Sequence, residues 1–345
     1  MILNISHLCY VKRTVLSEFK TQTRGGRGSK GASSRDEDFI EHIFSAFTHD
    51  YLLIFTEKGR CFWLRIFELP EGNKNTKGRA VQNLIQIEPD DKIRAYLSVS
   101  QLSDPDYLNN NFVVFCTKRG VIKKTSLEAY SRPRSNGINA ISINEDDQLI
   151  SVALTNGKSH IMLASKEGQA IHLPEDAVRS MGRNATGVRG IRLGENATNE
   201  VVGMICVQDP ENETVMVVSE NGYGKRSKVI DYRITNRGGK GVKTLNITEK
   251  TGILIGIANV EDDNDLMIIN QSGVTIRLPI SSVRVAGRNT QGVKLINLKG
   301  NDSIAAVAKV MKDDDETTEE MDSESSENEA TKEDGRAIEN NETEN

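Results

Sequence analysis

Gln22-Thr-Arg-Gly-Gly-Arg-Gly28, with Lys30 just beyond it, is the stretch around which the rest of the chain is organised. Glycine has no Cβ and adopts positive φ readily, so this backbone can lie close to a partner. The guanidinium groups of Arg24 and Arg27 match pairs of phosphate oxygens. A near copy, Thr235-Asn-Arg-Gly-Gly-Lys-Gly241, returns later in the chain. The loop is therefore one copy of a repeated, basic, glycine-rich segment.

Loops of this kind recur with a period of 50 to 59 residues, and they end at Gly28, Gly78, Gly137, Gly187, Gly241 and Gly292. A four-residue turn precedes each loop, at Ser6–Cys9, Thr56–Gly59, Thr117–Gly120, Ser165–Gly168, Ser219–Gly222 and Asn270–Gly273. A Ser, Thr or Asn at the first position of the turn and a Gly at the fourth indicate a type I turn that ends in a left-handed residue. A fixed period indicates repeated structural units, here six.

Apolar, β-branched runs flank these turns and indicate strands with a buried face. Clear examples are Tyr51–Thr56, Cys61–Ile66, Phe112–Thr117, Val121–Thr125, Met216–Ser219 and Met267–Asn270. A third strand is expected after each loop, at Ala80–Ile87, Ile138–Ile143, Val188–Leu193, Val242–Ile247 and Val293–Leu298. A fourth follows, as at Leu149–Leu154 and Val201–Val207. Four strands in some fifty residues is typical of a propeller blade, and six blades form a ring. A β-solenoid or a pair of β-sandwiches is the alternative, but sandwiches do not keep so constant a turn-to-loop distance.

Residues 1–310 are thus expected to form one all-β domain. The sequence has no run of 18 apolar residues and no signal peptide, so no membrane is expected. The strand-like Met1–Ser6 begins abruptly, which hints at a piece of a larger polypeptide or one made separately from it. The four cysteines lie far apart without metal-ligand spacing, so they are expected to be buried reduced thiols.

The net charge of −5 combines two opposite parts. Residues 311–345 hold 15 acidic and 3 basic residues, whereas residues 1–310 hold 34 acidic and 41 basic ones. The acidic part is almost free of apolar residues and is predicted to be a disordered tail. It either keeps the protein soluble or acts as a polyanion that competes for the basic surface of the same chain.

Two loops have the Gly-x-x-x-x-Gly frame of a P-loop, Gly182–Gly187 and Gly287–Gly292. Val188 and Val293 follow them where the phosphate-binding lysine is needed, so nucleotide binding is not expected. Thr48-His49-Asp50 is interpreted as a turn. No other catalytic motif is found, so we predict that this chain is not an enzyme and holds no metal or cofactor.

Positive charge recurs at one place in each unit, as expected for a belt around a ring. The predicted DNA-binding residues are Gln22, Thr23, Arg24, Gly25, Gly26, Arg27, Gly28, Lys30, Arg13, Lys77, Arg79, Lys123, Lys124, Arg132, Arg134, Arg179, Arg183, Arg189, Lys225, Arg226, Lys228, Arg233, Arg237, Lys240, Arg284, Arg288 and Lys294, with Lys74 beside them. Such a belt suits a bent polyanion held by its backbone, with strong salt dependence and little sequence preference. The alternative is an ordinary solvated surface.

The stretch Gln22–Gly28 resembles the Gln-Arg-Arg-Gly-Gly-Lys-Gly box of the C-terminal domains of DNA gyrase A, in the type IIA topoisomerases. The resemblance covers residues 1–310 and includes Tyr10-Val-Lys12, Leu16–Phe19, Glu37–Ile40, Met181-Gly182, Thr186–Gly194, Asn221–Arg226 and Gly287–Val293. Thr23 stands where the box has Arg, which removes one charge, and Arg27 replaces Lys. The near copy Asn236–Gly241 can compensate.

The resemblance implies a six-bladed β-pinwheel whose blades exchange strands, with double-stranded DNA wrapped on its rim. It implies an A2B2 complex with the N-terminal breakage-reunion region of gyrase A and with gyrase B. There, wrapping with positive writhe leads to negative supercoils. The breakage tyrosine and the ATP and Mg²⁺ sites would lie outside this chain, in a cytoplasmic, nucleoid-associated bacterial enzyme. Alternatives are the C-terminal domain of the topoisomerase IV counterpart of gyrase A, which generally lacks an intact box, and a propeller that binds proteins.

Overall fold

The computed structural model describes residues 1–6, 9–15, 29–30, 40–73, 76–100, 102–298, 300 and 302–311, without the side chains of 29–30, 40–44 and 310–311. The predicted box residues Gln22–Gly28, Lys74 and the tail after Met311 lie outside these ranges. Residues 1–310 form one compact unit.

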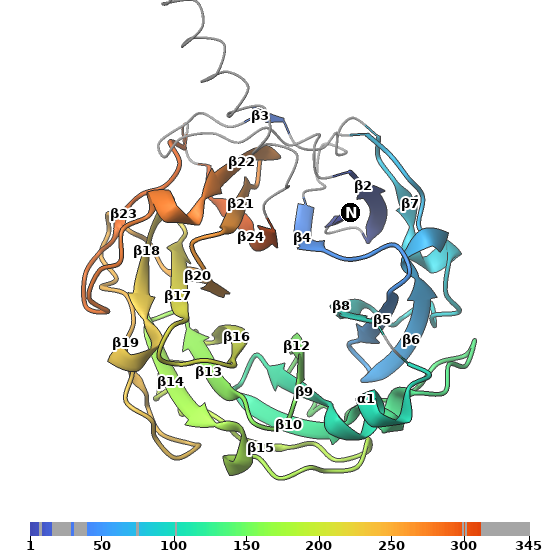
Figure 1. The fold of residues 1–345 in the computed structure, drawn as a ribbon. Coiled ribbons are helices and arrows are strands. Elements are labelled where there is room, and N and C mark those ends of the chain that lie inside the picture. The colour runs from blue at the N-terminus through green and yellow to red at the C-terminus, as the bar shows by residue number, and fades with distance from the viewer. Residues whose placement is uncertain are drawn as a thin grey trace, which may run out of the picture. The chain divides into compact units, whose positions relative to one another are not determined.

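The described residues form six four-stranded sheets arranged around a central axis (Figure 1). From the innermost strand outward, blade 1 consists of β4 (Ile40–Ser45), β1 (Ile2–Ser6), β2 (Tyr10–Thr14) and β7 (Arg79–Ala80), and blade 2 of β8 (Ile93–Val99), β5 (Tyr51–Thr56), β6 (Arg60–Arg65) and β11 (Ile138–Asn139). In the same order, blade 3 consists of β12 (Leu149–Thr155), β9 (Phe112–Thr117), β10 (Val121–Ser126) and β15 (Val188–Arg189), and blade 4 of β16 (Val201–Val207), β13 (His160–Ser165), β14 (Gln169–Pro174) and β19 (Val242–Lys243). Blade 5 consists of β20 (Leu254–Val260), β17 (Thr214–Ser219), β18 (Tyr223–Lys228) and β23 (Val293–Lys294), and blade 6 of β24 (Ile304–Met311), β21 (Asn264–Asn270), β22 (Val274–Pro279) and β3 (Ser29–Lys30). The predicted all-β, six-bladed fold is confirmed.

Helical structure in the described ranges is confined to short segments. They are α1 (Pro105–Asn110) and the 3-10 helices η2 (Ile66–Glu68), η3 (Val81–Asn83), η4 (Leu127–Tyr130), η5 (Glu175–Ala177), η6 (Val229–Asp231) and η7 (Ile280–Ser282). Five of these 3-10 helices directly follow the third strand of a blade, and each starts the segment that crosses to the neighbouring blade.

Each blade takes its outermost strand from the next repeat in the sequence. Strand β7, for example, follows β6 of blade 2 but pairs with β2 of blade 1. The ring closes in the same way, because β3 follows β2 of blade 1 and pairs with β22 of blade 6 through Val274 and Lys30. The strand exchange implied by the resemblance is therefore present, and it links every pair of adjacent blades.

The predicted turns are present with the predicted geometry. In all six, the backbone N–H of the fourth residue donates to the carbonyl of the first, at 2.8–3.0 Å. The fourth residue has positive φ in every case, including Cys9 at 59°. Among the described loop-ending glycines, Gly78, Gly137, Gly187, Gly241 and Gly292 also have positive φ. A left-handed residue therefore recurs at two fixed positions in the repeat.

The predicted third strands are wrong in length, because only two residues of each pair with the neighbouring blade. In the clearest case, β11 ends at Asn139 and the N–H groups of Ala140 and Ile141 both turn to the carbonyl of Gly59. The chain then points inward, and Ala140 and Ile141 are 0% and 3% exposed. These apolar residues pack between blades rather than along a strand.

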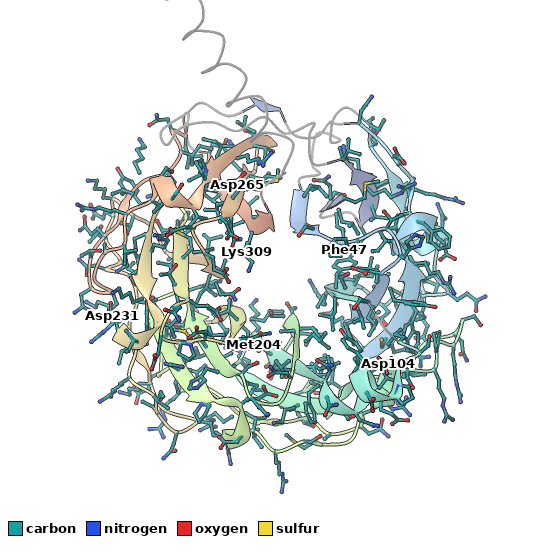
Figure 2. The ribbon with its side chains drawn as sticks, in the orientation of Figure 1. Phe47, Asp104, Met204, Asp231, Asp265 and Lys309 are labelled. Carbon is teal, nitrogen blue, oxygen red and sulfur yellow. The ribbon has the colours of Figure 1, made fainter. Side chains whose placement is uncertain are left out.

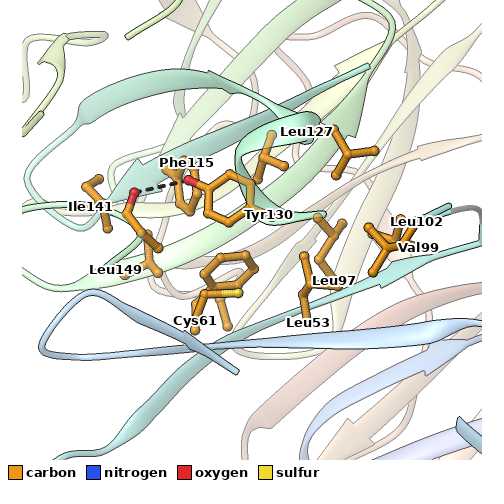
Figure 3. Packing of buried hydrophobic residues seen from close by; sticks show 14 of the residues in the cluster. Leu53, Cys61, Leu97, Val99, Leu102, Phe115, Leu127, Tyr130, Ile141 and Leu149 are labelled. Atoms are coloured by element: carbon orange, nitrogen blue, oxygen red, sulfur yellow. Dashed lines mark hydrogen bonds between the residues drawn. The ribbon is translucent and has the colours of Figure 1, made fainter. Parts of the chain in front are cut away.

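The core lies between adjacent blades. Between blades 2 and 3, Leu53 and Phe55 pack against Phe115 and Tyr130 (Figure 3). The rings of Phe55 and Phe115 meet edge to face, with centroids 5.2 Å apart. Each fully buried Leu or Phe stabilises the fold by about 1.5–3 kcal/mol. The interior therefore fixes the angle between blades and the course of the outer edge.

Candidate nucleic-acid interface

Five rim segments form the outer edge of the described ring: residues 69–80 (described except for 74–75), 131–139, 178–189, 232–243 and 283–294. Each runs from a 3-10 helix to the outer strand of the preceding blade, and in all but 131–139 its first part forms a parallel bridge with the second strand of that blade's hairpin. Met181 N, for example, donates to Lys124 O at 2.8 Å, and Ala286 N donates to Arg226 O at 2.7 Å. These four rim segments are thus bonded to the sheet of the preceding blade at both ends, and 131–139 is bonded to it through β11.

Most predicted cations lie on these segments, and Figure 2 shows nitrogen-tipped side chains that project outward around the edge of the ring. The exposed ones are Lys77, Arg79, Arg132, Arg134, Arg179, Arg189, Arg233, Arg237, Lys240, Arg284 and Lys294, together with Lys228 at the end of β18. Arg183 and Arg288 are half-buried. Within the described part of the chain, none of these side chains forms an ion pair with a carboxylate. Their charge is therefore available to a polyanion.

The outer strands place cations at equivalent points of successive blades. The second residue of the outer strand is Lys30, Arg189, Lys243 or Lys294 in four blades, Asn139 in β11 and Ala80 in β7, where the cation Arg79 comes first. Lys243 is exposed and was missed by the sequence-based prediction, although it stands two residues after Gly241 as Arg189 does after Gly187. Counting from the loop-ending glycine would have found it.

Arg60 is a second residue that the sequence-based prediction missed. It lies opposite Asn139 in the β6–β11 pair, and its guanidinium donates to the carbonyls of Asn136 and Gly137. No local motif marks it, because its position on the rim depends on the strand exchange.

Five predicted DNA-binding cations are buried or paired and do not belong to the exposed rim cations. Lys123, Lys124, Lys225 and Arg226 are 0–7% exposed, and Arg13 pairs with Glu71 at 2.9 Å. They occupy the middle of the hairpin's second strand, which the next rim segment covers. We therefore leave these five residues out of the proposed interface, because four are buried beneath a rim segment and the fifth, Arg13, is paired with Glu71.

The buried lysines instead bond to the carbonyl groups of the rim segments. Lys123 Nζ donates to Ala140 O and Arg183 O, both at 2.6 Å, and Lys225 Nζ donates to Gly287 O at 2.7 Å. Burial, together with a smaller effect of Arg183, lowers the pKa of Lys123 from its ordinary 10.5 to about 7. These lysines therefore position the rim from below.

Buried carboxylates accompany some of these cations. Glu175, 1% exposed, lies 3.5 Å from Lys124 Nζ and accepts hydrogen bonds from Thr155 and Ser159. Arg277 and Asp265, both buried, pair at 2.6 Å in blade 6. These pairs are structural, since neither partner faces the solvent.

The Gly-x-x-x-x-Gly loops are rim segments and not phosphate loops. Their last glycines, Gly187 and Gly292, have positive φ and touch the sheet, whereas Gly182 and Gly287 have open space where a Cβ would be. Each loop leads into a two-residue outer strand. The described residues contain no group of three or more potential metal-ligating side chains. Nor do they contain a helix with the length and apolar character needed to cross a bilayer.

The same repeat appears in comparisons with known proteins. The family described as "DNA gyrase C-terminal domain, beta-propeller" matches residues 10–46, 50–100, 111–156, 159–208, 213–261 and 264–311. DNA gyrase A of Staphylococcus aureus strain MRSA252 is 43% identical over 343 residues, which cover 99% of this chain and 38% of that protein. DNA gyrase A from strain NCTC 8325 gives the same identity over 345 residues. The chain thus spans 38% of the length of these relatives.

Two solved structures share the fold. A DNA gyrase A C-terminal domain matches with a TM-score of 0.79 and 23% identity, covering 90% of this chain and 99% of that one. A C-terminal domain of DNA topoisomerase IV matches with a TM-score of 0.68 and 24% identity, over 90% and 93% of the two chains. With one family match for each blade and 43% identity along nearly its whole length, the chain belongs to the DNA gyrase C-terminal domain family of β-propellers.

Proposed function

We propose that this chain binds double-stranded DNA along the rim and bends it around the ring, largely independently of base sequence. The observation that carries this proposal is the row of exposed rim cations, which recur on all five described rim segments without carboxylate partners. Contacts to phosphates fix the course of a duplex but carry no sequence information. A curved row of them therefore favours bent DNA of any sequence.

The proposed interface consists of the exposed members of the predicted set and the half-buried Arg183 and Arg288. Lys243 and Arg60, which the sequence-based prediction missed, are added to them. The box residues Gln22–Gly28 and the neighbouring Lys30 remain part of the proposal on the strength of their sequence. The buried Lys123, Lys124, Lys225 and Arg226 are left out, as is the paired Arg13. The rim is therefore proposed to bind DNA through flexible surface side chains on segments that buried lysines hold in place.

In the larger enzyme, we infer that the wrapped DNA has positive writhe and that strand passage then introduces negative supercoils. The proposed partners are the N-terminal region of gyrase A and the whole of gyrase B in an A2B2 complex, which acts on the bacterial nucleoid in the cytoplasm. The chain itself would be non-catalytic, with the breakage tyrosine, ATP and Mg²⁺ in other parts of the complex. A role in topoisomerase IV is the second candidate, favoured by the altered box position Thr23.

Ligation of a nicked plasmid in the presence of the purified chain tests wrapping directly. A chain that wraps DNA with positive writhe shifts the linking number of the closed circles upward, whereas a chain that binds without wrapping leaves it unchanged. An unchanged topoisomer distribution at saturating protein would refute the wrapping proposal.

A matched pair of triple variants tests the rim. The rim variant carries Arg79→Gln, Arg189→Gln and Lys294→Gln. The control variant carries Lys58→Gln, Lys118→Gln and Lys166→Gln, which lie on hairpin turns and pair with carboxylates. Each lost phosphate contact lowers the slope of log affinity against log salt by about 0.9, so the rim variant should lose about 2.7. Equal slopes in the two variants would exclude these rim positions.

A further inference from the structure

A hollow of about 650 Å³ opens at the rim between blades 2 and 3. Four arginine side chains line it: Arg60 from β6, Arg132 and Arg134 from the rim segment 131–139, and Arg183 from the rim segment 178–189. Among its described lining residues, Glu128 carries the one negative charge. The hollow therefore has a strongly positive wall assembled from three consecutive repeats.

The length of one rim segment accounts for the position of the hollow. The segment 131–139 has nine residues, whereas the other four described segments have twelve. A shorter segment covers less of the joint between the blades. The hollow lies at this joint, beside Gly137, Ile138 and Asn139.

The walls of the hollow are bonded to the core beneath it. Tyr130, 0% exposed, immediately precedes the segment that carries Arg132; its hydroxyl donates to Ala140 O at 3.1 Å, and its carbonyl accepts from Trp63 Nε1 at 3.1 Å. Lys123 Nζ, also bonded to Ala140 O, holds the carbonyl of Arg183 at 2.6 Å.

One of the four guanidinium groups is itself held. Arg60 donates to the carbonyls of Asn136 and Gly137, and Gly137 itself lines the hollow. Ordering a long side chain on binding costs about 0.5–1.5 kcal/mol, and this cost is smaller where the structure has already fixed the group. The hollow is thus better prepared for an anion than the freely exposed cations elsewhere on the rim.

We propose that this arginine hollow is the strongest phosphate-binding anchor on the described rim and takes phosphate groups of the DNA backbone as the duplex passes from blade 2 to blade 3. The inference rests on the proposed DNA binding and adds that affinity is concentrated at one joint. Guanidinium groups bind phosphate oxygens in pairs, so several converging arginines suit one or two adjacent phosphates. The position on the rim favours DNA over a small phosphate compound as the ligand.

Equal charge removal at two places on the rim tests the anchor. The hollow variant carries Arg132→Gln, Arg134→Gln and Arg183→Gln, and keeps Arg60 because of its bonds to the backbone. The control variant carries Arg189→Gln, Arg233→Gln and Arg284→Gln. Binding of a short duplex at fixed salt should weaken about tenfold more in the hollow variant, because its three arginines converge with Arg60 on the same one or two phosphates, whereas the three control arginines lie on separate rim segments. Equal losses would overturn the proposal, whereas failure of the unaltered chain to bind duplex would overturn DNA binding itself.

A gain of affinity cannot be attributed to misfolding, so Glu128→Gln supplies an independent test. Removing this carboxylate should tighten duplex binding, whereas Glu145→Gln, the same change in an exposed turn outside the hollow, should have a clearly smaller effect. Equal effects would refute the anchor.

Inorganic triphosphate tests whether the phosphate ligand is DNA or a small compound. If the anchor binds DNA, triphosphate should bind the unaltered chain more weakly than duplex does. Triphosphate binding as tight as duplex, lost in the hollow variant, would make a small phosphate compound the ligand and overturn the DNA anchor.

Discussion

Two glycines of one rim segment provide a sharp test of how the repeat holds its rim. Gly287 and Gly292 begin and end the same Gly-x-x-x-x-Gly loop. Gly292 has a φ of +80°, and a Cβ built on it would lie 2.3 Å from the carbonyl oxygen of Gly224. A Cβ on Gly287 would meet nothing within 4 Å, and its φ is not positive. The same substitution therefore has opposite predicted effects five residues apart.

For Gly292→Ala, the left-handed backbone costs about 1–2 kcal/mol in a residue with a Cβ. The overlap with a sheet carbonyl forces a backbone shift, and overpacking of this kind costs about 1–3 kcal/mol. The free energy of unfolding should therefore fall by about 2–5 kcal/mol. For Gly287→Ala, the smaller freedom of the unfolded chain should raise it by about 0.4–1 kcal/mol.

Urea unfolding of the two variants and the unaltered chain, followed by circular dichroism, measures both values. The m-value should stay the same if only stability changes. If Gly292→Ala is as stable as Gly287→Ala, the loop-ending glycine is not required by the backbone, and the explanation of the repeat by a left-handed residue at that point fails.

Three further predictions follow from the buried cations and the acidic tail. Lys124→Met should lower the unfolding free energy by about 3–5 kcal/mol, because Glu175 stays buried without its cation; adding Glu175→Gln should restore part of it in the same urea assay. Between pH 7 and 10.5 the unfolded chain keeps a proton on Lys123 that the folded chain has lost, so the unfolding free energy should rise with pH. The unfolding free energy of Lys123→Met should rise less over this pH range than that of the unaltered chain. If the two plots of unfolding free energy against pH run parallel, the lowered pKa of Lys123 is contradicted. Deletion of Asp313–Asn345 should tighten duplex binding at low salt, measured by fluorescence anisotropy, whereas unchanged affinity would leave the tail a solubilising role.

The sequence was sufficient for the fold because the repeat marks its own fixed points. The turn glycines and loop-ending glycines occupy left-handed positions that few other residues tolerate, so their spacing reports the period of the blade. The length of the outer strands was harder to predict from the sequence. Runs such as Ile138–Ile143 are apolar at most positions, and a buried run has the same pattern whether it pairs along an edge or turns inward between sheets.

The candidate site was only partly predictable for a related reason. Lys123 and Lys124 look like surface charges, because the segment that covers them comes from the next repeat, about sixty residues later. Arg60 looks ordinary for the opposite reason, since strand exchange brings it to the rim beside Asn139. Exposure in this fold depends on which repeat covers which strand, and local sequence does not carry that information.

Strand exchange also connects stability with the proposed function. The carbonyls of Arg183 and Gly287, which Lys123 and Lys225 hold, belong to rim segments that continue from the hairpin of one blade and end in the outer strand of the preceding blade, so each of these two segments connects two sheets. DNA that pulls on the rim would load hydrogen bonds shared between blades rather than a free loop. A duplex is stiff, and bending a short site through a large angle costs several kcal/mol by elastic estimates, about 1–6 for 40–90°. A surface that bends DNA must itself resist deformation, and a ring whose outer edge is bonded from below and closed by exchanged strands meets that requirement.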